Sequence, residues 1–257
     1  MKFYVGILKL NSYNILMMKI KSQKYKIAET ISIIAHRLKN PIAVIKGYLE
    51  ALLEGDCGEI NQTQKEYLGD ALLNVKEMSK TLDSLIDASR IDAKEYKLNI
   101  QSVDMSKLAD EIMQGFYIWA KAANCEISFK KDENIPLVMT DPVKIKQVMD
   151  NFIANAIKYN HGKGVVSVSL LFQSKNKEIL FQCQDNGIGI AKEDYKKVFT
   201  KFYRSQEAIA IDSSGAGLSL FISKAIIELS GGKIWFTKNT GKNEGTIFSF
   251  SLPVSKI

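Results

Sequence analysis

The sequence predicts two domains: a hairpin of two long α-helices, followed by an α+β two-layer sandwich. Apolar residues recur at spacings of three and four along residues 27–52 and again along 68–86, as on one face of a helix. After about residue 104, segments rich in β-branched and aromatic residues alternate with further helical patterns. The chain has 257 residues, 46% of them hydrophobic, which is enough for both cores.

The first 25 residues are predicted to be a basic leader or linker helix. Residues 1–26 contain six lysines and no acid, so this end could lie on an anionic membrane surface, although we favour a solvated lead-in helix. Its apolar runs fall far short of the ~20 residues that cross a bilayer. We therefore expect a cytoplasmic chain without a transmembrane segment, in which peripheral membrane association stays open.

The composition excludes some classes of protein. A net charge of +7 suits polyanionic ligands or acidic surfaces, but it is too small to indicate a nucleic-acid partner. The three cysteines are far apart, and the only histidines are His36 and His161. We therefore expect reduced thiols and no zinc site.

Residues 26–94 are predicted to form the helical hairpin. The turn residues Glu54–Gly58 separate the two apolar stripes. Pro41 lies inside the first helix, five residues after His36, and predicts a bend there, because proline removes a backbone donor. A hairpin cannot bury both of its faces alone, so we expect two copies to pair as a homodimeric four-helix bundle.

Residues 95–103 are predicted to be an irregular linker, and 104–254 the sandwich. We expect a helix over 105–123, a strand over 126–130, and a helix that Asp141 caps and Pro142 opens, running to about Asn160. Strands are then expected over 165–172 and 178–184, and a final pair over 233–237 and 246–252. Between these lie a segment of small residues, 205–214, expected to be mobile, and a helix over 218–229.

Three groups of residues in this second domain point to a nucleotide. Asn151, Asn155 and Lys158 project from one side of a helix, where an asparagine oxygen suits Mg²⁺ and a lysine suits phosphate. The alternative for this group is an ordinary polar helix face. Each of the three groups is weak evidence on its own.

The second group, Asp185-Asn186-Gly187-Ile188-Gly189, follows a strand directly. Its carboxylate can accept from the exocyclic amine of a base such as adenine, although a plain turn is the alternative. The third group, Gly215-Ala216-Gly217-Leu218-Ser219, opens a helix, where free backbone N–H groups favour phosphate.

In their order and spacing, these groups and the histidine resemble the motifs of a sensor histidine kinase of two-component signalling, from about Lys26 to Pro253. His36–Pro41 resembles the HisKA-type phosphoacceptor box and Asn151–Lys158 the N box. Asp185–Gly189 and Gly215–Leu220 resemble the two glycine boxes, and Phe199–Phe202 the F box. The fold implied is a dimerisation and histidine phosphotransfer hairpin, then a Bergerat-type (HATPase_c) ATP-binding domain.

The resemblance also implies roles for individual residues. Asn155 would hold Mg²⁺, Asn151 and Lys158 would meet the phosphates of ATP, Tyr159 would lie by the nucleotide, and Asp185 would bind adenine. Residues 205–214 would be a lid anchored by Phe199 and Phe202, with Arg204 near the triphosphate.

By the same resemblance, His36 would be phosphorylated by ATP and would pass the phosphoryl group to an aspartate of a response regulator receiver domain. Asn40 would position water for the reverse, dephosphorylating reaction. The input would come from a sensor, either bound to the membrane or separate, or through the basic leader.

Two positions depart from the family pattern. Arg37 stands where an acid usually follows the phosphoacceptor, and a guanidinium cannot accept a proton. If the hairpin turns near Cys57–Ile60, His36 faces roughly Leu82–Asp83, so Asp83 is a candidate substitute base. Ser219 stands where a third glycine is usual, and we expect its side chain to reduce ATP affinity relative to a Ser219→Gly variant.

The predicted function is an ATP-dependent protein histidine kinase. One alternative is a kinase-impaired member of the family that acts mainly as a regulator phosphatase, and another is a nucleotide-binding dimeric scaffold without catalysis. Chaperones and topoisomerase subunits share the pocket but lack a histidine hairpin ahead of it.

Overall fold

The computed structural model of the protein describes residues 29–160, 162–240 and 245–255. Its internal contacts divide the chain into two units, residues 1–96 and 97–257, and each unit is described by itself. The basic leader predicted over 1–25 and the second histidine, His161, lie outside the described residues. Among the helices of the described part, none combines the length and the hydrophobicity that a membrane span requires.

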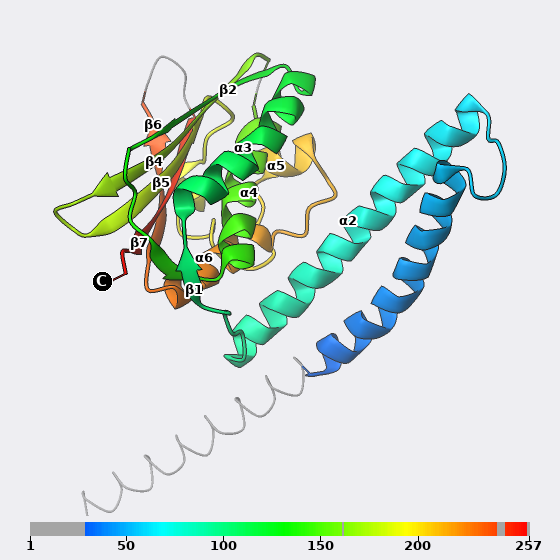
Figure 1. Cartoon of the computed structure of the whole chain (residues 1–257), viewed down its shortest axis with the longest axis horizontal. Helices are drawn as coiled ribbons and strands as arrows, with labels where there is room; N and C mark the ends of the chain where they lie inside the picture. Colours follow the sequence, from blue (N-terminus) through cyan, green and yellow to red (C-terminus); the bar gives the residue numbers. More distant parts are fainter. Residues whose placement is uncertain (1–28, 161, 241–244, 256–257) are drawn as a thin grey trace, which may run out of the picture. The chain divides into compact units, whose positions relative to one another are not determined.

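The first unit is the predicted helical hairpin (Figure 1). Residues 29–54 form one helix that continues through Pro41 and is bowed, as the sequence predicts for a proline in a helix interior. The chain then turns through Gly55 and Gly58, which both have positive φ. The second helix, α2 (Gln62–Ala93), begins at a capping box in which the side chains of Asn61 and Gln64 each accept from the other's backbone N–H.

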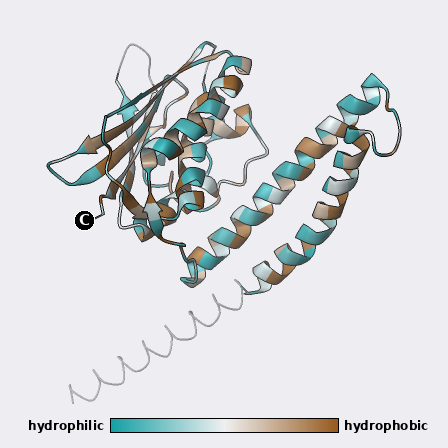
Figure 2. Ribbon diagram, in the orientation of Figure 1, coloured by the Kyte–Doolittle hydropathy of each residue, from teal (hydrophilic) through white to brown (hydrophobic). Residues whose placement is uncertain are grey.

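Many apolar residues of the hairpin stay uncovered within a single chain. Ile42 and Val75 are buried, but Ile34, Ile45 and Leu73 are exposed, Leu73 by 63%. Figure 2 shows hydrophobic residues along the whole of both helices. The two helices therefore leave part of the predicted apolar stripe without a partner within the hairpin.

The second unit is an α+β sandwich, as predicted. One layer is a five-stranded sheet with the order β2-β4-β5-β7-β6, in which only β2 and β4 are parallel neighbours. Its strands are β2 (Cys125–Lys131), β4 (Gly164–Gln173), β5 (Glu178–Asp185), β6 (Lys233–Asn239) and β7 (Gly245–Pro253).

Three long helices form the other layer, on one face of that sheet (Figure 1). They are α3 (Met105–Ala122), α4 (Pro142–Lys158) and α6 (Ser219–Leu229). The core between the layers centres on Phe152 of α4, whose ring lies 5.2 to 6.4 Å from the rings of Phe181, Phe248 and Phe250. This apolar contact fixes α4 against β5 and β7.

The start of α4 follows the sequence prediction. The side chain of Asp141 accepts from the backbone N–H groups of Val143 and Lys144, and Pro142 is the first helical residue. Asp141 also accepts from the backbone of Asn99, which lies in the predicted linker. One aspartate thus caps the helix and fixes the chain that leads into the domain.

Two predicted segments have more regular structure than expected. The last residues of the predicted linker form strand β1 (Gln101–Val103), which pairs with β3 (Val138–Thr140). The segment expected to be mobile contains a short helix, α5 (Gln206–Ile211), capped by Ser205. The cause for β1 is a tertiary contact, the pairing with β3, which the local sequence does not reveal. The short helix α5 is held by local hydrogen bonds, from the backbone N–H of Ala208 to the side chain of Ser205 and from Arg204 to the carbonyl of Ala208.

Candidate active site

Asp185 is the buried acid at the centre of the candidate site. It is the last residue of β5, and only 7% of it is exposed. Its Oδ1 accepts from the backbone N–H groups of Gly187, at 2.9 Å, and Thr246, at 3.0 Å. Burial raises the pKa of this carboxyl, and the two hydrogen bonds offset part of that rise. No described residue hydrogen-bonds to Oδ2, which leaves one oxygen to accept from a ligand.

The glycine of this turn, Gly187, is required by a close backbone approach. A Cβ at Gly187 would lie 2.3 Å from the carbonyl oxygen of Tyr159, which accepts from the N–H of Ile188. The turn after β5 therefore packs directly on the end of α4. A Cβ at Gly189 would make only an ordinary contact, 3.8 Å from the carbonyl oxygen of Gly245, but its φ of +69° favours glycine.

The polar side of α4 carries the three predicted residues with different surroundings. Asn151 donates from Nδ2 to the buried hydroxyl of Ser223 on α6, at 3.2 Å, so it joins two helices. Asn155 is half-buried, and its side chain makes no hydrogen bond with the described part of the chain. An amide oxygen in this situation fits a Mg²⁺ ion that is otherwise held by phosphate and water.

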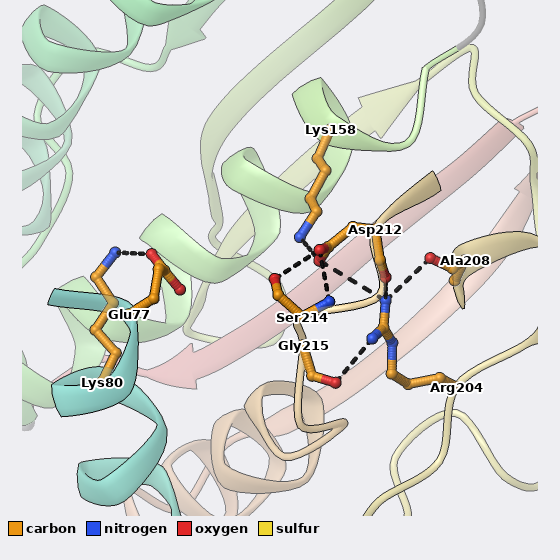
Figure 3. A network of polar contacts seen from close by, with 8 residues as sticks. All are labelled: Glu77, Lys80, Lys158, Arg204, Ala208, Asp212, Ser214 and Gly215. Carbon is orange, nitrogen blue, oxygen red and sulfur yellow. Dashed lines mark hydrogen bonds and ion pairs between the residues drawn. The ribbon is translucent and has the colours of Figure 1, made fainter. Parts of the chain in front are cut away.

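Lys158 and Arg204 meet at one carboxylate, that of Asp212 (Figure 3). The ammonium of Lys158 pairs with Oδ2 of Asp212, and an Nη2 of Arg204 lies 3.7 Å from the same oxygen. Arg204 also donates to the backbone carbonyls of Ala208 and Gly215, at 3.0 and 2.8 Å, and to that of Asp212. The contacts of Arg204 that the structure shows are therefore with the predicted lid and with the first residue of the predicted phosphate loop.

The predicted phosphate loop leads into α6. Gly217 has a φ of +67°, and a Cβ there would lie 2.8 Å from the backbone carbon of Phe202, so glycine is needed. Ala216 is half-buried and Leu218 is buried at the N-cap of α6, which has no side-chain cap. The first N–H groups of α6, including that of the half-buried Ser219, are thus available to an anion.

The two predicted lid anchors differ. Phe199 is half-buried, and its ring lies 6.1 Å from Phe236 and 6.4 Å from Phe248. Phe202 is 63% exposed and has a φ of +61°, so its side chain is not packed in the core. The chain is held there by the backbone N–H of Phe202, which donates to the carbonyl of Gly217 at 2.9 Å.

In the hairpin, His36, Arg37 and Asn40 are all exposed on the helix over residues 29–54. Asp83 of α2 forms an ion pair with Lys39, three residues after His36. Asp83 of α2 therefore lies within reach of the helical turn that follows His36.

Four residues of the site were not predicted from the sequence, and each of them lies against Asp185 or Asn151. Thr246 donates to the carboxylate of Asp185, and Asn239 donates to its backbone carbonyl at 2.8 Å. A Cβ at Gly245 would lie 2.2 Å from that same carbonyl. Ser223 accepts from Asn151. The only signal that could have identified two of them is the pair Gly245-Thr246 at the start of a strand.

Metal binding by protein groups alone is not supported. No cluster of three or more His, Cys, Asp or Glu side chains in the described ranges could hold a metal ion. A cation at this site would thus depend on an amide oxygen and on ligand phosphates.

Comparison with known proteins identifies both units. Residues 26–94 match the model of the His Kinase A (phospho-acceptor) domain, and residues 140–256 that of the histidine kinase-, DNA gyrase B- and HSP90-like ATPases. Sensor histidine kinase WalK of Bacillus subtilis is 32% identical over 225 residues, which cover 88% of this chain and 36% of WalK. The chain spans about a third to a half of the length of the WalK proteins that it matches.

Two solved structures share the fold. The full-length protein ShkA in complex with AMPPNP has a TM-score of 0.71 and 19% identity, over 89% of this chain and 46% of ShkA. Histidine kinase ThkA in complex with the response regulator protein TrrA has a TM-score of 0.55 and 22% identity, over 88% of this chain and 61% of that chain. With a phosphoacceptor hairpin and an ATPase domain in this order, the chain belongs to the sensor histidine kinase family.

Proposed function

We propose that this chain is an ATP-dependent protein histidine kinase that phosphorylates His36 and transfers the phosphoryl group to an aspartate of a response regulator. The observation that carries the proposal is a histidine exposed to solvent on a phosphoacceptor hairpin, in a chain that also contains an ATPase domain. Exposure matters because the γ-phosphate of ATP must reach the ring.

The residues around Asp185 bind the nucleotide in this proposal. Oδ1 is held by two backbone donors, so Oδ2 is directed to accept from the exocyclic amine of adenine. The uncapped N-terminus of α6 receives phosphate oxygens, and Lys158 and Arg204 add positive charge. Tyr159 lies at the junction of α4 with the glycine turn, next to the base.

Asn155 would hold Mg²⁺ through its amide oxygen, together with phosphate and water. The ion would neutralise part of the negative charge on the triphosphate. Asn151, whose Nδ2 donates to Ser223, would meet the phosphates.

The chemical step is an in-line phosphoryl transfer. The unprotonated ring nitrogen of His36 attacks the γ-phosphorus, an N–P bond forms, and the bond from phosphorus to the β,γ-bridging oxygen breaks, so that ADP leaves with the electron pair. The other ring nitrogen then gives up its proton. The aspartate of the regulator afterwards attacks the same phosphorus, and His36 is released.

Asp83 stays our candidate for the acceptor of that proton, because Arg37 cannot act as one. Its ion pair with Lys39 places the carboxylate near the helical turn that follows His36. Asp83→Asn is expected to slow autophosphorylation and to leave ATP affinity unchanged. An unchanged rate would remove Asp83 from the mechanism.

We further propose that the chain works as a homodimer. The uncovered apolar residues of the hairpin, such as Ile34, Ile45 and Leu73, support pairing with a second copy into a four-helix bundle. Sedimentation at micromolar concentration should show a dimer, and a stable monomer would contradict this proposal. The exposed Asn40 would position water for dephosphorylation of the regulator, and a sensor would supply the signal.

The kinase proposal is tested by incubating the protein with Mg²⁺ and γ-labelled ATP. We expect a label that is stable to base and labile to acid, which His36→Gln abolishes. The matched control is His161→Gln, because the chain contains only these two histidines. Label on His36→Gln, or none on the wild type, would contradict the proposal.

The same assay separates the alternatives. A nucleotide-binding scaffold would bind ATP and transfer no label, and a regulator phosphatase would remove label from a phosphorylated receiver domain without acquiring its own. No observation on the described part of the chain favours either of them.

A further inference from the structure

The contact between Asp212 and the two cations of the ATP site has no part in the function proposed so far. Asp212 ends α5, in the segment between Arg204 and the phosphate loop. Its carboxylate pairs with Lys158, which lies 54 positions earlier in the chain, and lies beside Arg204 (Figure 3). The structure therefore places one anion on both of the side chains that are expected to meet phosphate.

The surroundings of Asp212 hold this carboxylate in a single position. Its Oδ1 accepts from the backbone N–H of Ser214, at 2.8 Å, and from the hydroxyl of Ser214, at 2.6 Å. The side chains of Asp212 and Arg204 are only 16% and 11% exposed, so solvent screens their attraction less than at an open surface. The contact is therefore built into the fold of the segment.

Asp212 is also a charged group at neutral pH. Burial raises the pKa of this carboxyl, but the hydrogen bonds from Lys158 and Ser214 outweigh burial and hold the pKa well below its usual value. A triphosphate that approached Lys158 would meet this negative charge. Phosphate and carboxylate beside one ammonium repel each other, so the binding of phosphate favours the departure of the carboxylate.

We propose that Asp212 is an internal counter-anion that competes with the phosphates of the nucleotide for Lys158 and Arg204. Affinity for ATP then includes the cost of moving this carboxylate away, and its departure releases the segment over residues 206–214. This inference rests on the proposed function, since it assumes that the two cations meet ATP. Because only phosphates compete with Asp212, a nucleoside without phosphate binds without displacing it.

The decisive variant is Asp212→Asn. Asparagine keeps the oxygen that accepts from Ser214, so the local turn is retained, while the charge is removed. Calorimetry with Mg-AMPPNP and with adenosine should show about a five- to tenfold tighter Kd for AMPPNP, with adenosine unchanged within about twofold. Asp212→Ser provides a second test of the same expectation if the first variant does not fold.

Glu207→Gln is the matched control. It removes one negative charge from the same segment, and within the described residues Glu207 makes no ion pair with Lys158 or Arg204. We expect it to change the Kd of AMPPNP less than about twofold. If Glu207→Gln raised the affinity for AMPPNP as much as Asp212→Asn does, the effect would be one of general charge, and the inference would be overturned.

Hydrogen exchange gives an independent readout. In the ligand-free protein, backbone amides over 206–214 should exchange faster in Asp212→Asn than in the wild type. If Asp212→Asn binds AMPPNP no more tightly than the wild type does, the inference is overturned. The proposed function stays intact in that case, as long as the wild type binds AMPPNP more tightly than adenosine. If neither protein binds AMPPNP, the proposed function fails, and the inference fails with it.

Discussion

Replacing Asp185 with asparagine tests the proposed adenine contact. The hydrogen bonds of the turn decide how the new side chain must lie. Oδ1 of Asp185 faces two backbone N–H groups, from Gly187 and Thr246, so the oxygen of an asparagine has to occupy that position. Its NH₂ group then takes the place of Oδ2. A donor would therefore face the amino group of adenine, which is also a donor.

The magnitude follows from the groups involved. A hydrogen bond to a charged acceptor is lost, and a buried donor is left opposite another donor, which together cost about 2–4 kcal/mol. The Kd of ATP should rise about 30- to 900-fold. For ITP, whose base presents a carbonyl oxygen at the same position, the NH₂ group of asparagine can donate. The ratio of ATP to ITP affinity should therefore fall in Asp185→Asn.

Isothermal calorimetry of both nucleotides measures this change, and urea unfolding separates it from a loss of stability. Because burial raises the pKa of Asp185, the folded protein binds this proton more tightly than the unfolded chain does. The stability of the wild type relative to Asp185→Asn should therefore increase as the pH falls through the raised pKa. An ATP affinity within about threefold of wild type, or equal losses for ATP and ITP, would refute the adenine contact.

Two further predictions concern the fold. Gly187→Ala should lower the free energy of unfolding by about 3 kcal/mol, because the new methyl group would lie 2.3 Å from the carbonyl oxygen of Tyr159. The control is Gly115→Ala in α3, where the new methyl group would have no atom within 4 Å. This variant should raise the free energy of unfolding by up to ~1 kcal/mol. Urea unfolding that gave the two variants the same change in stability would contradict this account. A chromogenic disulfide reagent should modify the exposed Cys57 in the native protein. Cys125 and Cys183 should react only after unfolding, because they are buried and burial raises the pKa of both thiols. Modification of more than one thiol in the native protein would contradict the burial of these two cysteines.

Local patterns predicted most of the elements. The cap at Asp141 with Pro142, the turn before α2 and the helical stripes each depend on residues within about four positions of one another, so the sequence reveals them directly. The need for glycine at Gly187 is of another kind, because its cause is contact with Tyr159, a residue that the motif does not contain.

Long-range contacts explain what the sequence did not predict. Asp83 was expected roughly opposite His36, and the structure shows its carboxylate paired with Lys39, three residues after His36 and 44 positions before Asp83. The segment over 205–214 was expected to be mobile, and the structure shows Asp212 of this segment paired with Lys158, which lies 54 positions earlier. Phe202 was expected to anchor this segment, and the contact that the structure shows there is the hydrogen bond from its backbone N–H to the carbonyl of Gly217, 15 positions later.

By itself, the sequence determined the two-domain architecture and most of the long helices and strands, and it named the candidate site residues, because spacing and caps are properties of short segments. Only the tertiary structure decided which groups hold Asp185. Thr246 lies 61 positions away and Asn239 54 positions away, and the sheet order brings both beside the end of β5. The same holds for Asp212 and Lys158, since packing alone sets the distance between charges that are far apart in the chain.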